Sequence, residues 1–215
     1  MTKLLFVRPA HDDVTAYLYY YSKELLNEAE RRGFISINKE KKEAVPGIIH
    51  QVIEKIRLSF IMFNGHGSPA MICGHNDEII IQLGKNHHVL KNRITYSLTC
   101  SSAAGVGQEV ADSDTTFIGY RDDFALGMDV HSQAAVHRDQ RARLFLEPSN
   151  LLVKSLLKGN TAQEAVEKSR ELIKRNISLL RTDPFPDAKD YIPYLFNNYL
   201  ILEVLGNNQA RLPST

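Results

Sequence analysis

Residues 59–63 (SFIMF), followed by Asn64-Gly65-His66-Gly67-Ser68, decide the fold class of this chain. The first five of these residues are apolar at nearly every position, which is typical of a parallel strand covered on both faces of a sheet. The glycine-flanked histidine that follows predicts a loop at the carboxyl end of this strand. The segment therefore predicts a central strand that delivers His66 to one edge of a buried sheet.

Three further stretches show the same pattern of an apolar strand with polar residues at its carboxyl end. They are residues 4–7, followed by the loop 8–13; residues 94–99 (ITYSLT), followed by Cys100; and residues 115–120 (TTFIGY), followed by Arg121. Active sites of mostly parallel sheets lie beyond the carboxyl ends of the strands. We therefore expect one rim to hold Asp12, Asp13, His66, Cys100, Ser101, Asp122 and Asp123.

The segments between these strands predict helices and one small hairpin. A helix over 14–32 is expected, with Asp12 or Asp13 as its N-cap and Gly33 as its stop. Up to the middle of the chain, the other expected elements are a strand over 34–37, a helix over 46–57, a hairpin of 71–73 with 78–83 outside the main sheet, and a short helix to about 111. In the second half we expect a surface loop or exposed helix over 137–143 and helices over 148–158 and from Thr161 onward, the last with Glu164 in a capping box. A turn over 183–186 and a final strand over 198–205 complete the expected order. Alternating strands and helices predict an α/β fold, with a mostly parallel central sheet and helices on both faces.

Length and composition set the broad class. A chain of 215 residues with 43% hydrophobic content predicts a single domain over 1–215. The net charge of +1 does not favour binding to the negative backbone of a nucleic acid, so we expect no nucleic-acid partner. No apolar run approaches the roughly 20 residues that a membrane span needs, so we expect no membrane protein. Two cysteines without a secretory leader indicate a reducing compartment, so we expect a cytoplasmic protein.

Cys100 and His66 have the chemistry of a nucleophile and a base. A free thiol has a pKa near 8.5, so a catalytic cysteine requires a neighbouring base, and adjacent strands lie only about 4.8 Å apart. Gly67 allows the backbone to approach a bound carbonyl, so its amide and that of Cys100 are candidates for an oxyanion hole. This chemistry requires no metal and no other cofactor.

The pair of motifs resembles the caspase-like cysteine peptidases of clan CD, with the gingipain and CHAT-domain branches as the nearest likeness. These families place the histidine of a His-Gly step after one core strand and the cysteine after the next, as His66-Gly67 and Cys100 stand here. The ending Leu205-Gly206-Asn207 is similar to the Leu-Gly-Asp-Pro-type ending of the same branches, although Asn207-Asn208 replaces Asp-Pro. The resemblance implies a three-layer caspase-like sandwich and cysteine endopeptidase activity.

Specificity is expected to depend on charged residues near the strand ends. A carboxylate pocket floor from Asp122 and Asp123, or from Asp12 and Asp13 as second choice, would favour Arg or Lys before the cut. Arg121 or Arg8 could instead read an acidic residue, and relatives often have a polar residue at the pocket position that Leu98 occupies here. The basic stretch 138–143 is interpreted as a solvated face, with self-cleavage there as an alternative.

Two other functions fit the same residues. The chain could be a catalytically silent caspase-like scaffold, or a cysteine amidase or acyltransferase that uses the same pair. The expected partners are a protein or peptide substrate and a regulatory subunit, because small caspase-like domains are often controlled by associated subunits. Cys73 is interpreted as structural, and a zinc set of Cys73, His75, His87 and His88 is disfavoured because its spacing matches no common ligand pattern.

Overall fold

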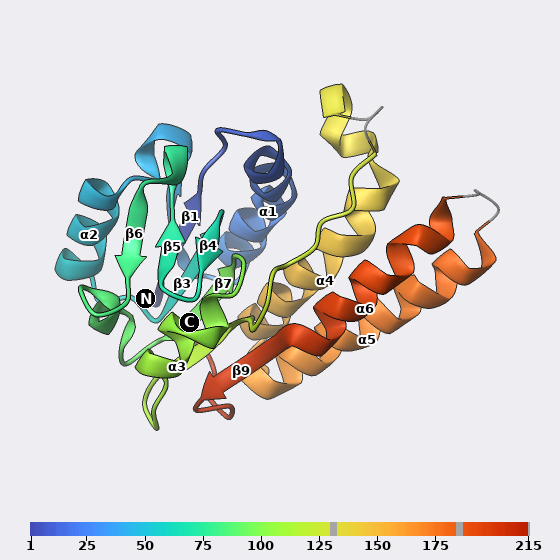
Figure 1. The fold of residues 1–215 in the computed structure, drawn as a ribbon. Helices are drawn as coiled ribbons and strands as arrows, with labels where there is room; N and C mark the ends of the chain where they lie inside the picture. The colour runs from blue at the N-terminus through green and yellow to red at the C-terminus, as the bar shows by residue number, and fades with distance from the viewer. Residues whose placement is uncertain (130–132, 184–186, 215) are drawn as a thin grey trace.

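A computed structural model describes residues 1–129, 133–183 and 187–214. In this part of the chain a six-stranded sheet has the order β2-β1-β3-β7-β8-β9 (Figure 1). Its first five members in that order run parallel, and β9 is antiparallel to β8. The bounds are β1 Lys3–Arg8, β2 Ile35–Glu40, β3 Phe60–Asn64, β7 Ile94–Leu98, β8 Thr116–Tyr120 and β9 Leu202–Gly206.

Helices cover both faces of this sheet. One face packs against α1 (Asp13–Arg31), α4 (Gln140–Leu157) and α5 (Ala162–Thr182), and α6 (Ile192–Ile201) packs in turn on α5. The other face packs against α2 (Pro46–Lys55), α3 (Val106–Val110) and a small antiparallel sheet of β4 (Gly67–Ser68), β5 (Met71–Cys73) and β6 (Ile79–Gln82). Short 3-10 turns are η1 Lys41–Glu43, η2 His75–Asp77, η3 His87–Leu90, η4 Ser102–Ala104, η5 Gln133–Arg138 and η6 Ala188–Tyr191. The expected α/β fold with helices on both faces and a small outer β element is confirmed.

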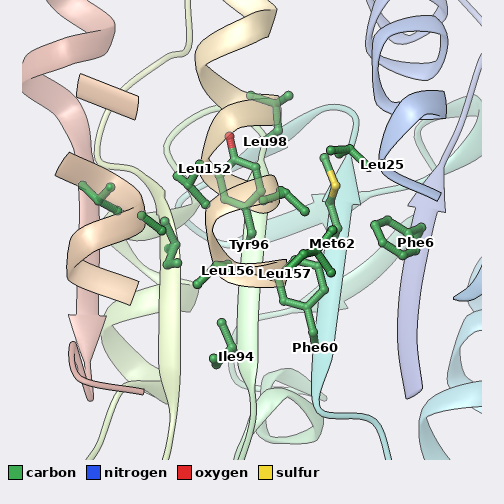
Figure 2. Close-up of a cluster of buried hydrophobic side chains, with 14 of the residues drawn as sticks. Phe6, Leu25, Phe60, Met62, Ile94, Tyr96, Leu98, Leu152, Leu156 and Leu157 are labelled. Carbon is green, nitrogen blue, oxygen red and sulfur yellow. The ribbon is translucent and has the colours of Figure 1, made fainter. Parts of the chain in front are cut away.

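Alternation along the central strands builds two cores on opposite faces of the sheet. Phe60 and Met62 of β3 enter the core under α1 and α4, whereas Ile61 and Phe63 enter the core under α2 and α3. Figure 2 shows the first of these cores, where Tyr96 and its neighbours on the sheet meet the leucines of α4. A strand that is buried on both faces is apolar at successive positions, which explains the SFIMF pattern.

Local sequence signals set several helix ends as expected. Asp12 is the N-cap of α1 and forms a capping box with Thr15, and Gly33 follows the helix with a left-handed φ of 81°. Thr161 and Glu164 form the expected capping box of α5. These caps satisfy amide groups that the first turn of each helix leaves without helical partners.

Three expected element bounds were wrong. Helix α4 begins at Gln140 rather than at 148, because the buried carboxylate of Asp139 accepts hydrogen bonds from the amides of Arg141 and Ala142 and caps the helix earlier. The final strand is shorter than expected, because residues 192–201 form α6 before β9 starts at Leu202. Strand β2 extends to Glu40 instead of ending at residue 37. The turn expected over 183–186 lies mostly outside the described residues.

The stretch 138–143 does not form an isolated loop. Its last four residues make the first turn of α4, where Ala142 is buried and Arg141 pairs with Asp183 and Asp187. None of the helices in the described ranges is both long and apolar enough to cross a membrane.

Leu156 of α4 is fully buried between the helix and the sheet, so Leu156→Ala should lower the free energy of unfolding by about 2–5 kcal/mol. Leu179→Ala is the matched control, because Leu179 is 61% exposed and its truncation should change stability by less than about 0.5 kcal/mol. Urea unfolding followed by circular dichroism measures both values. Equal losses for the two variants would contradict the assigned packing of α4.

Candidate active site

His66 and Cys100 follow neighbouring strands at the same register. The parallel pairing of β3 with β7 ends at Asn64 opposite Leu98, and His66 and Cys100 each lie two residues beyond this pair. The amide of Gly65 donates to the carbonyl of Leu98 at 3.3 Å, so the ladder continues toward the two side chains. The two functional residues therefore leave the sheet at adjacent strand ends.

The loops that carry these two residues contact each other. A Cβ atom at Gly67 would lie 2.9 Å from Thr99 Cβ, so only glycine allows this loop to lie against the end of β7. Farther along, the amide of Val106 donates to the carbonyl of Pro69 at 2.8 Å. In the described contacts the imidazole of His66 and the thiol of Cys100 share no hydrogen bond.

Asp12 holds the imidazole of His66. The distance from His66 Nε2 to Asp12 Oδ2 is 2.6 Å, and Asp12 Oδ1 accepts from the amide and the hydroxyl of Thr15 at 2.7 and 2.8 Å. Burial would raise the pKa of Asp12, but the hydrogen bonds from Thr15 and His66 outweigh it and lower the pKa to about 2. An ionised carboxylate only accepts, so His66 Nε2 carries a proton toward Asp12, and in the neutral imidazole the lone pair is on Nδ1.

Cys100 is a partly buried thiol in an unfavourable electrostatic environment for a thiolate. Its Sγ lies 4.0 Å from the carbonyl oxygen of Phe124. Burial raises the pKa of Cys100, the hydrogen bond with Phe124 partly opposes this rise, and the negative charges of Asp123 and Asp122 add to it. The resting thiol is therefore mainly protonated at neutral pH, and its attack on a substrate requires a base.

Ser101 links the cysteine loop to the end of β8. Ser101 has a left-handed φ of 53°, its amide donates to the Asp122 carbonyl at 3.1 Å, and its hydroxyl donates to Asp123 Oδ1 at 2.7 Å. The expectation of a buried carboxylate floor was wrong in one respect, because Asp122 and Asp123 are both exposed. They stand on the rim beside Cys100, where water can reach them. Asp13 is also exposed, in the first turn of α1.

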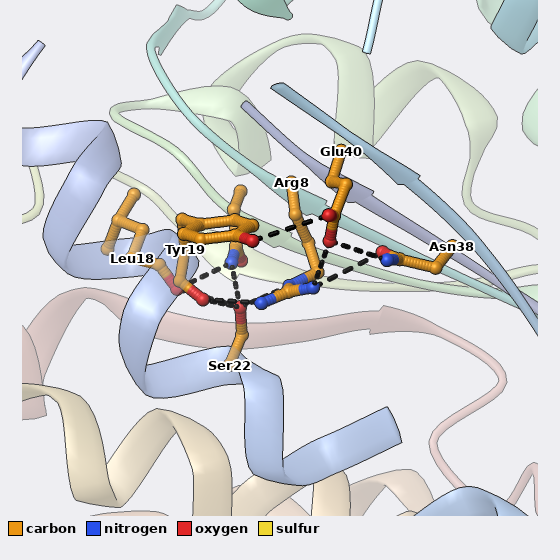
Figure 3. Close-up of polar contacts among 7 residues, drawn as sticks. Arg8, Leu18, Tyr19, Ser22, Asn38 and Glu40 are labelled. Carbon is orange, nitrogen blue, oxygen red and sulfur yellow. Dashed lines mark hydrogen bonds and ion pairs between the residues drawn. The ribbon is translucent and has the colours of Figure 1, made fainter. Parts of the chain in front are cut away.

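Arg8 lies buried beneath the site and cannot read an acidic substrate residue, which corrects that expectation. Its side chain is 1% exposed, and its guanidinium pairs with Glu40 at 3.1 Å and donates to Ser22 Oγ at 2.8 Å (Figure 3). It also lies over the ring of Tyr19, with 4.5 Å between Cζ and the ring centroid. Each nitrogen of the guanidinium thus has a partner within the protein itself.

Asn64 shares Ser22 with Arg8. Asn64 Nδ2 donates to Ser22 Oγ at 3.0 Å and to the carbonyl of Leu18 at 3.1 Å. Both Arg8, at the end of β1, and Asn64, at the end of β3, are therefore anchored to α1. This anchoring fixes the loop that carries Asp12 relative to the loop that carries His66.

Sequence reasoning missed two residues of the site, His11 and Asp77. His11 Nε2 lies 3.5 Å from Asp12 Oδ2 and 3.3 Å from Asp77 Oδ1. In the described ranges, the potential metal-binding group is His11, Asp12 and His66, and the disfavoured set around Cys73 does not assemble. The sequence could have indicated His11, because it directly precedes Asp12 in a loop at the end of a strand. No sequence pattern indicated that Asp77, in η2, would lie near these residues.

The arrangement of the secondary structure defines the fold class. A mostly parallel central sheet flanked by helices on both faces matches the caspase-like α/β fold.

Comparisons with known proteins support this class through structure alone. No family model and no curated protein matches the chain. Among solved structures, a chain in the complex of the pro- and mature domains of RgpB from Porphyromonas gingivalis matches with a TM-score of 0.60 at 10% identity. The match covers 99% of this chain and 48% of that chain, so the present chain spans about half the length of its structural neighbour. At this identity the similarity shows a relation of fold.

Asp12→Asn should reduce stability in a pH-dependent way. Asparagine remains a good N-cap, so the substitution mainly removes the carboxylate charge. Because the folded pKa is about 2 and the ordinary value is 3.8, the carboxylate stabilises the fold above about pH 4, and this stabilisation disappears as the pH falls toward 2. The difference in urea midpoint between wild type and variant should therefore shrink from pH 6 to pH 2.5. A difference that stays constant with pH, or one that Asp13→Asn reproduces, would contradict this prediction.

Asp123→Asn should lower the pKa of Cys100, because it removes a neighbouring negative charge and retains a group that can accept from Ser101. The measurement is the rate of iodoacetamide alkylation against pH, with the Cys100 peptide resolved by mass spectrometry. The midpoint of the profile should move to lower pH in the variant. Asp114→Asn, at the opposite end of β8, is the control and should leave the midpoint in place. A midpoint that rises or stays fixed in Asp123→Asn would count against the assigned electrostatics.

Proposed function

We propose that this chain is a caspase-like cysteine endopeptidase in which His66 and Cys100 form the catalytic pair. The observation that carries the proposal is the shared register of these residues beyond β3 and β7, combined with the Asp12 carboxylate on His66. The fold-level relation to the RgpB domains is consistent with it. Within the caspase-like group, we propose the gingipain and CHAT-domain branches as the nearest relatives, because the His-Gly and cysteine motifs of this chain resemble theirs.

The geometry suggests a defined path for the proton. Cys100 Sγ forms a bond to the substrate carbonyl carbon as its proton passes to the free Nδ1 of His66. Asp12 stabilises the resulting imidazolium through Nε2 and acts as a positioning residue. His66 then protonates the leaving amine, and water hydrolyses the acyl-enzyme thioester to release the acid and restore the thiol. Because no hydrogen bond joins the described imidazole and thiol, the proposed reaction requires a movement of the two loops that brings them into contact.

The proposed oxyanion site uses the amides of Gly67 and Cys100. Cys100 lies two residues beyond β7, and Gly67 begins β4 three residues beyond β3. The close approach of Gly67 to Thr99 brings these two backbone segments side by side. Donors on a rigid strand end are preorganised for the charge that develops on the carbonyl oxygen. The proposed oxyanion site therefore requires glycine at position 67, as does the packing against Thr99.

The proposed preference is for Arg or Lys before the cut. The exposed carboxylates of Asp122 and Asp123 lie near Cys100 and raise the pKa of its thiol. A cationic substrate side chain placed between them would offset their charge and make proton transfer from the thiol easier. The same contact would thus serve binding and activation.

The proposed setting is the cytoplasm, since Cys73 and Cys100 are both free thiols, as a reducing compartment keeps them. A peptide or protein is the proposed substrate. A regulatory partner subunit remains a prediction, and the structural neighbour is itself described as a complex of pro- and mature domains.

Cys100→Ala should abolish labelling by an acyloxymethyl ketone that carries Lys or Arg and reduce peptide cleavage to background. His66→Ala should reduce kcat/KM by about 10²–10⁴-fold, the typical contribution of a general base. Cys73→Ala is the control, because the thiol of Cys73 is buried and takes no part in the proposed chemistry, so its loss should leave labelling intact.

A fluorogenic peptide library that varies the residue before the cut measures specificity. Preference for Asp or an apolar residue would eliminate the carboxylate pocket. Equal labelling of wild type and Cys100→Ala would favour the scaffold function, and ammonia release without peptide cleavage would favour an amidase.

A further inference from the structure

We propose that His11, Asp12, His66 and Asp77 form a Zn²⁺ site that switches off the catalytic pair. The binding site is inferred from geometry alone, whereas its inhibitory effect rests on the proposed function of His66. Two of these residues follow β1, one follows β3 and one lies in η2, so the site joins three separate segments of the chain.

The distances between the candidate ligand atoms suit a tetrahedral ion. Zinc bonds to nitrogen and oxygen of about 2.0–2.2 Å place neighbouring ligand atoms about 3.3 Å apart. His11 Nε2 lies 3.3 Å from Asp77 Oδ1 and 3.5 Å from Asp12 Oδ2, so each of these two pairs already has that spacing. The ligand atoms of His11, Asp12 and His66 all lie within 4.8 Å of one another. Asp77 contacts this group through His11 and would complete the site by a movement of its exposed side chain. His66 Nε2 and Asp12 Oδ2 are closer, at 2.6 Å, because a hydrogen bond joins them. Binding would widen this pair by about 0.7 Å.

The buried ring of His11 is held in place by its neighbours. Its side chain is only 9% exposed, and its Nδ1 is buried without a hydrogen-bond partner. The ring packs edge-on against His66 and His75, with centroid separations of 6.0 and 5.3 Å. Neither neighbouring ring forms a hydrogen bond with it in the described contacts. Nε2 faces both carboxylates and is the atom that would bind the ion, and the unpartnered Nδ1 would carry the proton of the metal-bound imidazole.

The donor set favours zinc over the hard alkaline-earth ions. Two neutral imidazoles and two carboxylates supply two nitrogen and two oxygen ligands, and the carboxylates neutralise the charge of a divalent ion. Imidazole suits Zn²⁺, whereas Mg²⁺ prefers oxygen ligands in octahedral geometry. Asp77 is 62% exposed in its side chain, so a metal can enter from solvent on this side.

Coordination would change the tautomer of His66. An imidazole that binds a metal through Nε2 must carry its proton on Nδ1. Nδ1 then becomes a donor and cannot accept the proton of Cys100. Zinc would also engage Asp12, which stabilises the imidazolium in the proposed reaction. The ion would therefore block the base without touching the sulfur atom, which distinguishes this site from direct capture of a thiol by zinc.

The test of the site is Zn²⁺ binding to the full chain, measured by titration calorimetry with a thiol-free reductant. Wild type and Cys100→Ala should bind one ion with equal affinity, and His11→Gln and Asp77→Asn should each weaken binding by at least about tenfold. His88→Gln, at an exposed histidine of η3, is the matched control and should bind as wild type. Mg²⁺ should give no comparable heat. Asp77→Asn is isosteric and exposed, so it keeps the test valid if His11→Gln fails to fold.

The test of inhibition is the rate of Cys100 alkylation by iodoacetamide with and without Zn²⁺. The ion should slow alkylation in wild type and should not slow it at the same concentration in Asp77→Asn. Loss of zinc binding in Cys100→Ala, or wild-type affinity in both His11→Gln and Asp77→Asn, would overturn the site. If peptide cleavage is never found but the binding results hold, the metal site stands and only the proposed peptidase function fails.

Discussion

The buried guanidinium of Arg8 is the constraint on which the site depends. An unpaired charge in this position would be strongly destabilising, so the surrounding residues must supply partners for it. Glu40 comes from β2, Ser22 from α1 and the aromatic ring of Tyr19 from the same helix. These contacts join α1 to β1 and β2, so the loop between β1 and α1 is anchored at both ends, and this loop places Asp12 beside His66.

Asp12 serves the fold and the site with the same carboxylate. One oxygen caps α1 through Thr15, and the other accepts from His66. Folding of the helix therefore sets the tautomer of the imidazole, since an ionised cap can only accept a proton donor. The chain would otherwise have to hold a histidine tautomer through a separate group, and here the helix end provides it.

The sequence predicted the residues that leave buried strands better than the residues that reach the site from elsewhere. The strand-end positions of His66 and Cys100 were predicted because apolar strands end shortly before them, and such positions gather at the carboxyl edge of a parallel sheet. The position of Asp12 was predicted, but not its contact with His66, because a carboxylate in a loop can face several directions. Asp77 lies in η2, whose left-handed residues place it by turn geometry that leaves no periodic signal. Helix α6 was mistaken for a strand because a short apolar run fits both periods.

In the proposed mechanism, the charges around the site disfavour catalysis when no ligand is bound. Asp122 and Asp123 oppose the thiolate on one side, and Asp12 and Asp77 give the histidines an anionic environment on the other. A substrate cation beside Cys100 would relieve the first effect and favour transfer of the proton to Nδ1. A metal cation beside His11 would be attracted by the second group of carboxylates and would bind His66 through Nε2, which leaves the proton on Nδ1. A substrate cation would thus favour the proposed reaction and a metal cation would block it, because the reaction requires a lone pair on Nδ1 of His66.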